Sequence, residues 1–126
     1  MDDKRAARIL IVEDEFLTAE MLSEYLQNAG FEICPTANTS EKALNTARGD
    51  HPDFVLMDVG LAGAVNGIDT ARSIINEMNI PLAFMTGYTS NDVISRLQDL
   101  NPAGIFQKPV TLSDIAKLIK QKLDIY

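Results

Sequence analysis

The residues of this chain best suited to chemistry each stand at the end of a short apolar run. Glu13 and Asp14 follow the first run, and Asp58 closes a later one. Thr86 and the pair Lys108-Pro109 end two further runs. If these runs are strands of one parallel sheet, then three carboxylates, one hydroxyl and one ammonium group meet at a single edge of that sheet.

This set of side chains suits phosphoryl chemistry that depends on a metal ion. Three neighbouring carboxylates repel one another, which predicts a bound cation, and oxygen ligands favour Mg²⁺ or Mn²⁺ over zinc. A carboxylate such as Asp58 can attack phosphorus and become an aspartyl phosphate. The cation, the Lys108 ammonium and the Thr86 hydroxyl would then neutralise the phosphoryl oxygens. Each residue alone is common at a strand end, so the ordered set carries the prediction.

The segments that must position these residues alternate between two hydrophobic patterns. Five short apolar runs predict strands, and five amphipathic segments predict helices. The predicted strands are Ile9–Glu13, Glu32–Thr36, Phe54–Asp58, Leu82–Thr86 and Ala103–Gln107. The predicted helices are Glu15–Ala29, Glu41–Arg48, Ile68–Met78, Asn91–Leu100 and Leu112–Leu123. Strict alternation favours an α/β fold in which helices cover both faces of a parallel sheet.

Polar residues and one glycine mark several of the expected helix ends. Thr89 and Thr111 each precede a carboxylate by three residues, which is the spacing of an N-terminal cap. Asn66 stands where it could cap the third helix. Gly30 follows the first helix as a stop signal.

Length and composition bound the class of protein. The chain has 126 residues, of which 46% are hydrophobic, and this is enough for one domain with a proper core. Eleven Lys and Arg against eighteen Asp and Glu give a net charge of −7, which argues against direct binding of nucleic acid. The early apolar run Ile9–Val12 is too short to cross a membrane. Cys34 is the only cysteine, so we expect no disulfide and a cytoplasmic location.

Taken together, Glu13-Asp14, Asp58, Thr86 and Lys108-Pro109 resemble the receiver domain of two-component response regulators. The resemblance covers residues 8–124. It implies a flavodoxin-like (βα)5 three-layer fold whose sheet has the strand order 2-1-3-4-5. We therefore expect a disordered tail over 1–7 and a receiver domain over 8–126.

The resemblance also implies a function. Receivers of this family accept a phosphoryl group, here on Asp58, from the histidine of a sensor kinase or of a histidine phosphotransfer protein. The resemblance implies that the phosphorylated domain changes its binding to a downstream protein. Alternatively, the domain passes the phosphoryl group on as a phosphorelay intermediate. The resemblance implies that the domain catalyses no reaction other than its own phosphorylation and dephosphorylation. The implied Mg²⁺ ligands are Asp14, Asp58 and the backbone carbonyl of Gly60, with Glu13 acting through water.

Two departures from the family pattern affect the expected switch. The loop after Asp58 is one residue longer than usual, and Ala62 replaces a proline. Ile105 occupies the position of the usual aromatic residue three before the lysine, and Phe106 should face the opposite side of its strand. We therefore expect the signal to leave Thr86 through Tyr88.

The segment Phe84–Thr89 partly resembles the FAT-GUY group of stand-alone receivers. A stand-alone, chemotaxis-receiver-like switch is the first hypothesis, and homodimer formation stays open.

Other functions on this fold fit the sequence less well. A pseudo-receiver would bind partners without phosphate, but the complete acidic set and Lys108 argue against it. A flavodoxin needs a hydroxyl- and glycine-rich loop where this chain has Glu13-Asp14-Glu15. An aspartate-nucleophile phosphatase needs a second Asp two residues after the nucleophile, where this chain has Gly60.

Overall fold

A computed structural model of the protein describes residues 6–59, 67–88 and 90–125. Most of the expected tail over 1–7 lies outside these ranges. Four residues discussed above also lie outside them: Gly60, Ala62, Asn66 and Thr89.

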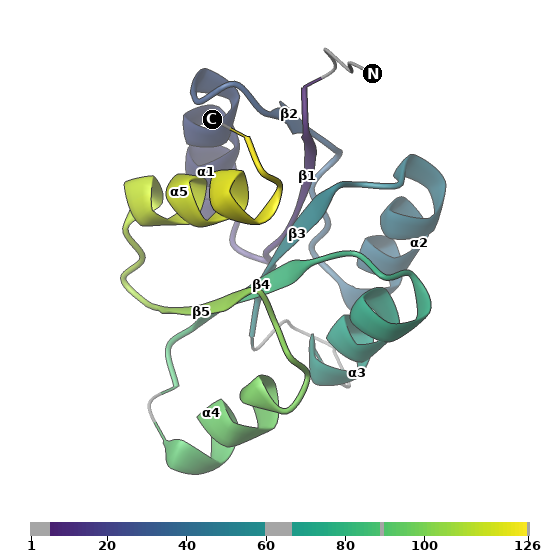
Figure 1. Ribbon diagram of the computed structural model, residues 1–126, viewed down its shortest axis with the longest axis vertical. Coiled ribbons are helices and arrows are strands. Elements are labelled where there is room, and N and C mark those ends of the chain that lie inside the picture. The colour runs from purple at the N-terminus through teal and green to yellow at the C-terminus, as the bar shows by residue number, and fades with distance from the viewer. Residues whose placement is uncertain (1–5, 60–66, 89, 126) are drawn as a thin grey trace.

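Strands and helices alternate along the chain as predicted (Figure 1). The strands are β1 (Arg8–Val12), β2 (Glu32–Ile33), β3 (Phe54–Asp58), β4 (Leu82–Thr86) and β5 (Gly104–Gln107). The helices are α1 (Phe16–Asn28), α2 (Ser40–Asp50), α3 (Gly67–Arg72), α4 (Asn91–Gln98) and α5 (Leu112–Lys122). A π-helical segment, η1 (Ser73–Glu77), continues α3, so the predicted helix over 68–78 changes its hydrogen-bonding pattern halfway.

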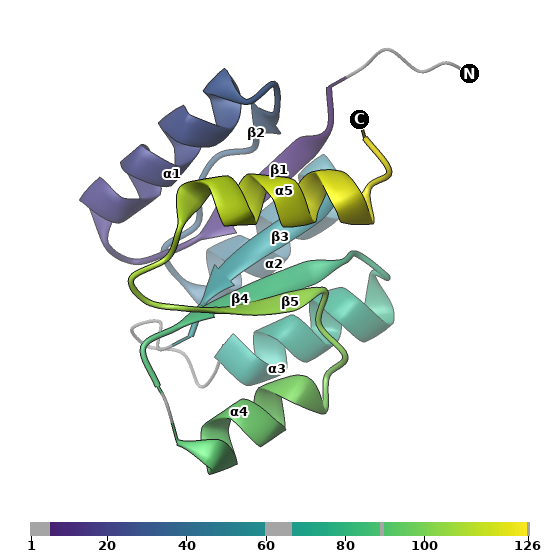
Figure 2. The ribbon, with the colours of Figure 1, turned by 60° about the vertical axis from the view of Figure 1, so that its left-hand side comes forward.

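All five strands are parallel, and the sheet has the order β2-β1-β3-β4-β5. Figures 1 and 2 show α1 and α5 on one face of this sheet and α2, α3 and α4 on the other. This arrangement confirms the expected flavodoxin-like three-layer fold.

Side chains of the central strands alternate between the two faces of the sheet, as the pleat requires. Ile9 and Ile11 of β1 pack with the core under α1 and α5, whereas Leu10 and Val12 pack with the core under the other three helices. Every residue of β3 is buried. Burial on both faces explains why the central strands are continuously apolar rather than alternating.

Strand β2 is shorter than the predicted Glu32–Thr36. Its ladder with β1 covers only Glu32 and Ile33, and a single bridge from Ala37 to Val12 follows. The amides of Glu32 and Cys34 donate to the carbonyls of Ala7 and Ile9, but the next amide that donates to β1 is that of Ala37. One extra residue after Cys34 therefore breaks the regular ladder.

Two of the expected helix-end signals, Thr111 and Gly30, lie among the described residues. Thr111 stands at the N-cap of α5 as expected, but its side chain makes no capping hydrogen bond, so that part of the prediction is wrong. Gly30 has φ +103°, and the amides of Gly30 and Phe31 donate to the carbonyls of Gln27 and Leu26, which ends α1 as predicted. At α4 the capping hydroxyl belongs to Ser90, which accepts a hydrogen bond from the amide of Val93.

Candidate functional site

The register of the sheet brings the predicted site residues to one edge. Val12 pairs with Met57, so Glu13 and Asp14 leave β1 beside Asp58, the last residue of β3. Thr86 closes β4 and pairs with Gln107, the residue before Lys108. The Lys108 amide also donates to the Thr86 carbonyl at 2.8 Å, which holds the two strand ends together.

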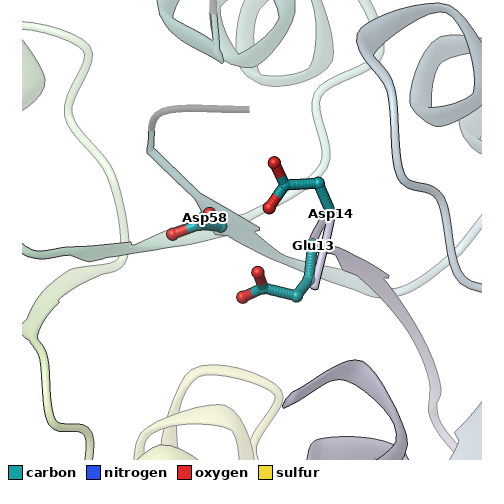
Figure 3. A group of neighbouring side chains, drawn as sticks. All are labelled: Glu13, Asp14 and Asp58. Carbon is teal, nitrogen blue, oxygen red and sulfur yellow. The ribbon is translucent and has the colours of Figure 1, made fainter. Parts of the chain in front are cut away.

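Three carboxylates converge at this edge, as Figure 3 shows. One oxygen from each of Glu13, Asp14 and Asp58 lies within 4.8 Å of the others. Glu13 and Asp58 are 3% and 4% exposed, whereas Asp14 is exposed to solvent. Glu13 and Asp58 are therefore buried at the sheet edge, and Asp14 is the member of the group that solvent reaches.

The Lys108 ammonium completes the charged site. Its Nζ lies 2.6 Å from Oδ1 of Asp58, and its side chain is 39% exposed. One cation against three carboxylates leaves an excess of negative charge at the strand ends.

The surroundings of these groups shift their proton affinities. Burial raises the pKa of Glu13, and the charge of Asp58 adds to this, although the Glu15 amide opposes it. Burial also raises the pKa of Asp58, and its contact with Lys108 offsets only part of the effect. Burial acts to lower the pKa of Lys108, but its hydrogen bond and ion pair with Asp58 outweigh burial and raise it. The lysine therefore stays charged while the buried acids favour a bound positive charge.

The two carboxylate oxygens of Glu13 differ in their hydrogen bonding, and the difference indicates a cation site. Its Oε2 accepts a hydrogen bond from the Glu15 amide at 3.1 Å. Its Oε1 is buried and has no hydrogen-bond partner. A buried carboxylate oxygen without a partner is costly, so the site fits a cation that this oxygen could bind directly or through water.

Thr86 is fully buried at the end of β4, yet its hydroxyl is connected to the surface. Its Oγ1 accepts a hydrogen bond from the amide of Tyr88 at 2.9 Å, and the Tyr88 side chain is 51% exposed. Because the hydroxyl hydrogen is not used in this bond, the Thr86 hydroxyl can still donate one hydrogen bond.

Ile105 and Phe106 face opposite sides of β5, as predicted. Ile105 packs against the core beneath α2, α3 and α4, and Phe106 packs against the core beneath α1 and α5. The structure therefore leaves no aromatic side chain of β5 on the face where Thr86 and α4 lie.

The sequence patterns above do not predict one feature of the helix that follows Asp14. Phe16, Leu17 and Met21 of α1 are exposed, and they begin two residues after Asp14. The helical period could have revealed them, because they lie off the face that Leu22 and Leu26 bury.

A search of the described helices for a membrane span finds none that is both long and apolar enough.

The comparisons with known proteins agree on one family. The model of the response regulator receiver domain matches residues 9–120. The transcriptional regulatory protein PdtaR of Mycobacterium tuberculosis is 33% identical over 113 residues, which are 90% of this chain and 55% of PdtaR. The chain thus spans about half the length of that relative.

A second relative has nearly the same length as this chain. The sporulation initiation phosphotransferase F of Bacillus subtilis is 30% identical over 120 residues, which are 94% of each protein. Among solved structures, the receiver domain of a modulated diguanylate cyclase from Desulfovibrio desulfuricans is 30% identical with a TM-score of 0.85. That match covers 95% of this chain and 99% of the solved chain.

Proposed function

This chain belongs to the response regulator receiver domain family, and we propose that it accepts a phosphoryl group on Asp58 and thereby switches the binding of a partner protein. The observation that carries the proposal is the setting of Asp58. Its carboxylate is buried at the end of the central strand, with the Lys108 ammonium 2.6 Å from one oxygen and two further carboxylates beside it.

The proposed reaction transfers phosphorus from nitrogen to oxygen. A carboxylate oxygen of Asp58 attacks the phosphorus of a phosphohistidine, and the P–N bond breaks with its electron pair going to the imidazole nitrogen. The product is an acyl phosphate on Asp58, and the released histidine takes a proton from water. Lys108 and Thr86 would donate their N–H and O–H groups to phosphoryl oxygens, and the 2.6 Å contact of Lys108 with Asp58 supports this role for the lysine.

The donor set supports Mg²⁺ or Mn²⁺ as the cofactor. Asp14 and Asp58 would hold the ion, with Glu13 contributing through water, and the unpartnered Oε1 of Glu13 supports a cation there. The carbonyl of Gly60 is the fourth proposed ligand. The ion would supply positive charge to the transferring phosphoryl group.

The partners are proposed from the chemistry of the site. The donor is a sensor histidine kinase or a histidine phosphotransfer protein, and a downstream protein reads the phosphorylated state. Similarity to a relative named as a phosphotransferase supports phosphorelay transfer as the alternative output. The acidic body of the chain disfavours direct nucleic-acid binding, and we propose that the domain works in the cytoplasm.

Acetyl phosphate provides a test that needs no knowledge of the donor. With Mg²⁺, intact-protein mass spectrometry should show one added phosphoryl group on the wild type and none on Asp58→Asn. A Glu24→Gln variant, which changes an exposed carboxylate of α1, is the matched control and should be labelled like the wild type. Equal labelling of Asp58→Asn would refute the assignment, and an unlabelled wild type would favour the pseudo-receiver.

A further inference from the structure

A cavity of about 360 Å³ lies at the edge of the sheet opposite the acidic group. Its walls come from the end of α2, which lies beside α3 (Figure 1), and from the segments that lead into β3 and β4. The lining residues are Ala47, Arg48, His51, Pro52, Met78 and Ile80. The five residues of β3 span about 15 Å between this cavity and Asp58, so it is separate from the proposed phosphoryl site.

Most of the cavity wall is apolar. Ala47 and Pro52 are buried, and Met78 and Ile80 are partly buried against the core on this face of the sheet. Small-molecule sites in proteins have volumes of about 300–1,000 Å³, so the cavity falls at the lower end of this range. At about 30 Å³ for each water-sized group, it holds about a dozen non-hydrogen atoms. Met78 favours an aromatic ring among them, because a thioether sulfur packs well against rings.

Two hydrogen-bond donors stand at the mouth of this apolar wall. Arg48 and His51 are exposed, and no described residue forms an ion pair with either side chain. Asp50, the acid nearest to Arg48 along α2, pairs with Arg8 instead. A guanidinium group binds a carboxylate through two parallel N–H bonds, and an imidazole ring donates at least one N–H. The two side chains together therefore suit a carboxylate.

The end of α2 works against a bound anion, but its effect is smaller than that of the arginine. The negative end of a helix dipole amounts to about half an elementary charge. Arg48 carries a full positive charge and can donate two N–H groups to the same carboxylate. The balance of charge at the cavity therefore favours an anionic group.

The backbone on both sides of the cavity is irregular. His51, at the C-cap of α2, has φ +49°, and Asn79, between the lining residues Met78 and Ile80, has φ +59°. Histidine adopts this left-handed conformation more readily than most residues, but glycine adopts it with no steric cost. The π-helical segment η1 ends directly before Met78, and π-helical turns are frequent at functional sites. An imidazole thus lines the cavity at a position where a glycine would be more favourable for the helix end alone.

We propose that this cavity binds a small aromatic carboxylate, with the carboxylate on Arg48 and His51 and the ring against Met78 and Ile80. The ligand site lies at the amino ends of β3 and β4, away from Asp58. The inference therefore goes beyond the proposed function and does not depend on phosphorylation.

NMR titration with 2-naphthoate, a fused ring that carries one carboxylate, tests the proposal. The amide signals of Arg48, His51 and Ile80 should shift, and those of Asp58 and Lys108 should not. A ligand of about a dozen atoms reaches a Kd of about 1 mM or lower in a site that fits it. The neutral analogue 2-naphthamide should bind at least about tenfold more weakly, because it lacks the charge that Arg48 recognises.

Variants separate the arginine and the histidine from the apolar wall. Arg48→Gln should weaken the binding of 2-naphthoate about tenfold or more, because it removes the charge-assisted hydrogen bonds. Arg96→Gln is the matched control, since Arg96 is an exposed arginine in the last turn of α4, and its Kd should equal that of wild type. His51→Gly should bind several-fold more weakly and still fold, because glycine suits the left-handed φ at this position.

Four results would overturn the proposal. The first is a wild type whose signals around the cavity do not shift with 2-naphthoate up to about 10 mM. The second is wild-type affinity in Arg48→Gln. The third is equal binding of 2-naphthamide and 2-naphthoate, which would leave the cavity apolar but not selective for an anion. The fourth is an equal loss of affinity in Arg96→Gln and Arg48→Gln, which would indicate a general effect of net charge.

Discussion

The backbone N–H of Tyr88 donates a hydrogen bond to Oγ1 of Thr86 over 2.9 Å, which joins an exposed loop to a fully buried hydroxyl. This bond offers a direct route from the proposed phosphoryl site to the surface. Ile105, on the neighbouring strand, stands where receivers of this family usually have an aromatic residue.

We predict that Tyr88 changes its environment when the site is filled. If Thr86 moves toward a phosphoryl group, the amide of Tyr88 must follow or lose its acceptor. Addition of beryllofluoride with Mg²⁺ should therefore shift the NMR signals of Tyr88 and of the first turn of α4, and leave Ile105 nearly unchanged.

Two variants check this route. Thr86→Val keeps the shape of the side chain but removes the acceptor, so it should abolish most of the shift at Tyr88. Ile105→Ala should keep the wild-type shifts across residues 90–107. The route is wrong if Ile105→Ala loses those shifts while Tyr88→Ala retains them.

Mg²⁺ should stabilise the folded domain through Asp14. A ligand that binds only the folded state at about one hundred times its Kd stabilises it by about 2.7 kcal/mol. Thermal unfolding of wild type should therefore shift upward with Mg²⁺, and Asp14→Asn should lose most of this shift. An undiminished shift in Asp14→Asn would exclude Asp14 as a ligand.

Removal of Lys108 should tighten the binding of Mg²⁺. The ammonium lies 2.6 Å from Asp58 and repels a divalent cation bound by the same carboxylate. Lys108→Met keeps much of the apolar length of the side chain and removes the charge, so titration calorimetry should give a Kd at least several-fold lower. Lys117→Met, an exposed lysine of α5, should leave the Kd unchanged. Weaker binding to Lys108→Met would show that the lysine does not oppose the ion.

When no metal is bound, Glu13 should make the free energy of unfolding depend on pH. Burial raises its pKa in the folded state above the ordinary value of 4.5, so the folded chain holds this proton to higher pH than the unfolded chain. The contribution of Glu13 to the stability of the folded state is therefore most favourable below pH 4.5, and it is lost as pH rises through the raised pKa. Each pKa unit by which the folded and unfolded states differ corresponds to about 1.4 kcal/mol of stability.

The comparison of wild type with Glu13→Gln isolates this effect. With a chelator present, urea unfolding should show that wild type loses stability relative to Glu13→Gln as pH rises from 4 toward neutral. Glu24→Gln replaces an exposed carboxylate and should show a much smaller change. A difference of the opposite sign would mean that Glu13 is stabilised as a carboxylate in the folded chain.

The sequence by itself determined the alternation of strands and helices and the edge at which the polar residues gather. Both follow from local patterns, because hydrophobic period distinguishes strand from helix and parallel strands end at a common edge. Glu13, Asp14 and Asp58 could be placed together on these grounds alone. The opposite orientation of Ile105 and Phe106 likewise followed from the period of two along a strand.

Tertiary structure alone decided the features that depend on segments far apart in the chain. The 2.6 Å contact of Lys108 with Asp58 and the unpartnered oxygen of Glu13 arise from how β1, β3 and β5 meet. The shortening of β2 depends on which amides after Cys34 reach the carbonyls of β1. Exposure of Leu17 beside the site depends on what packs against α1. Distances, burial and hydrogen-bond partners are properties of packed neighbours, and a local pattern does not contain them.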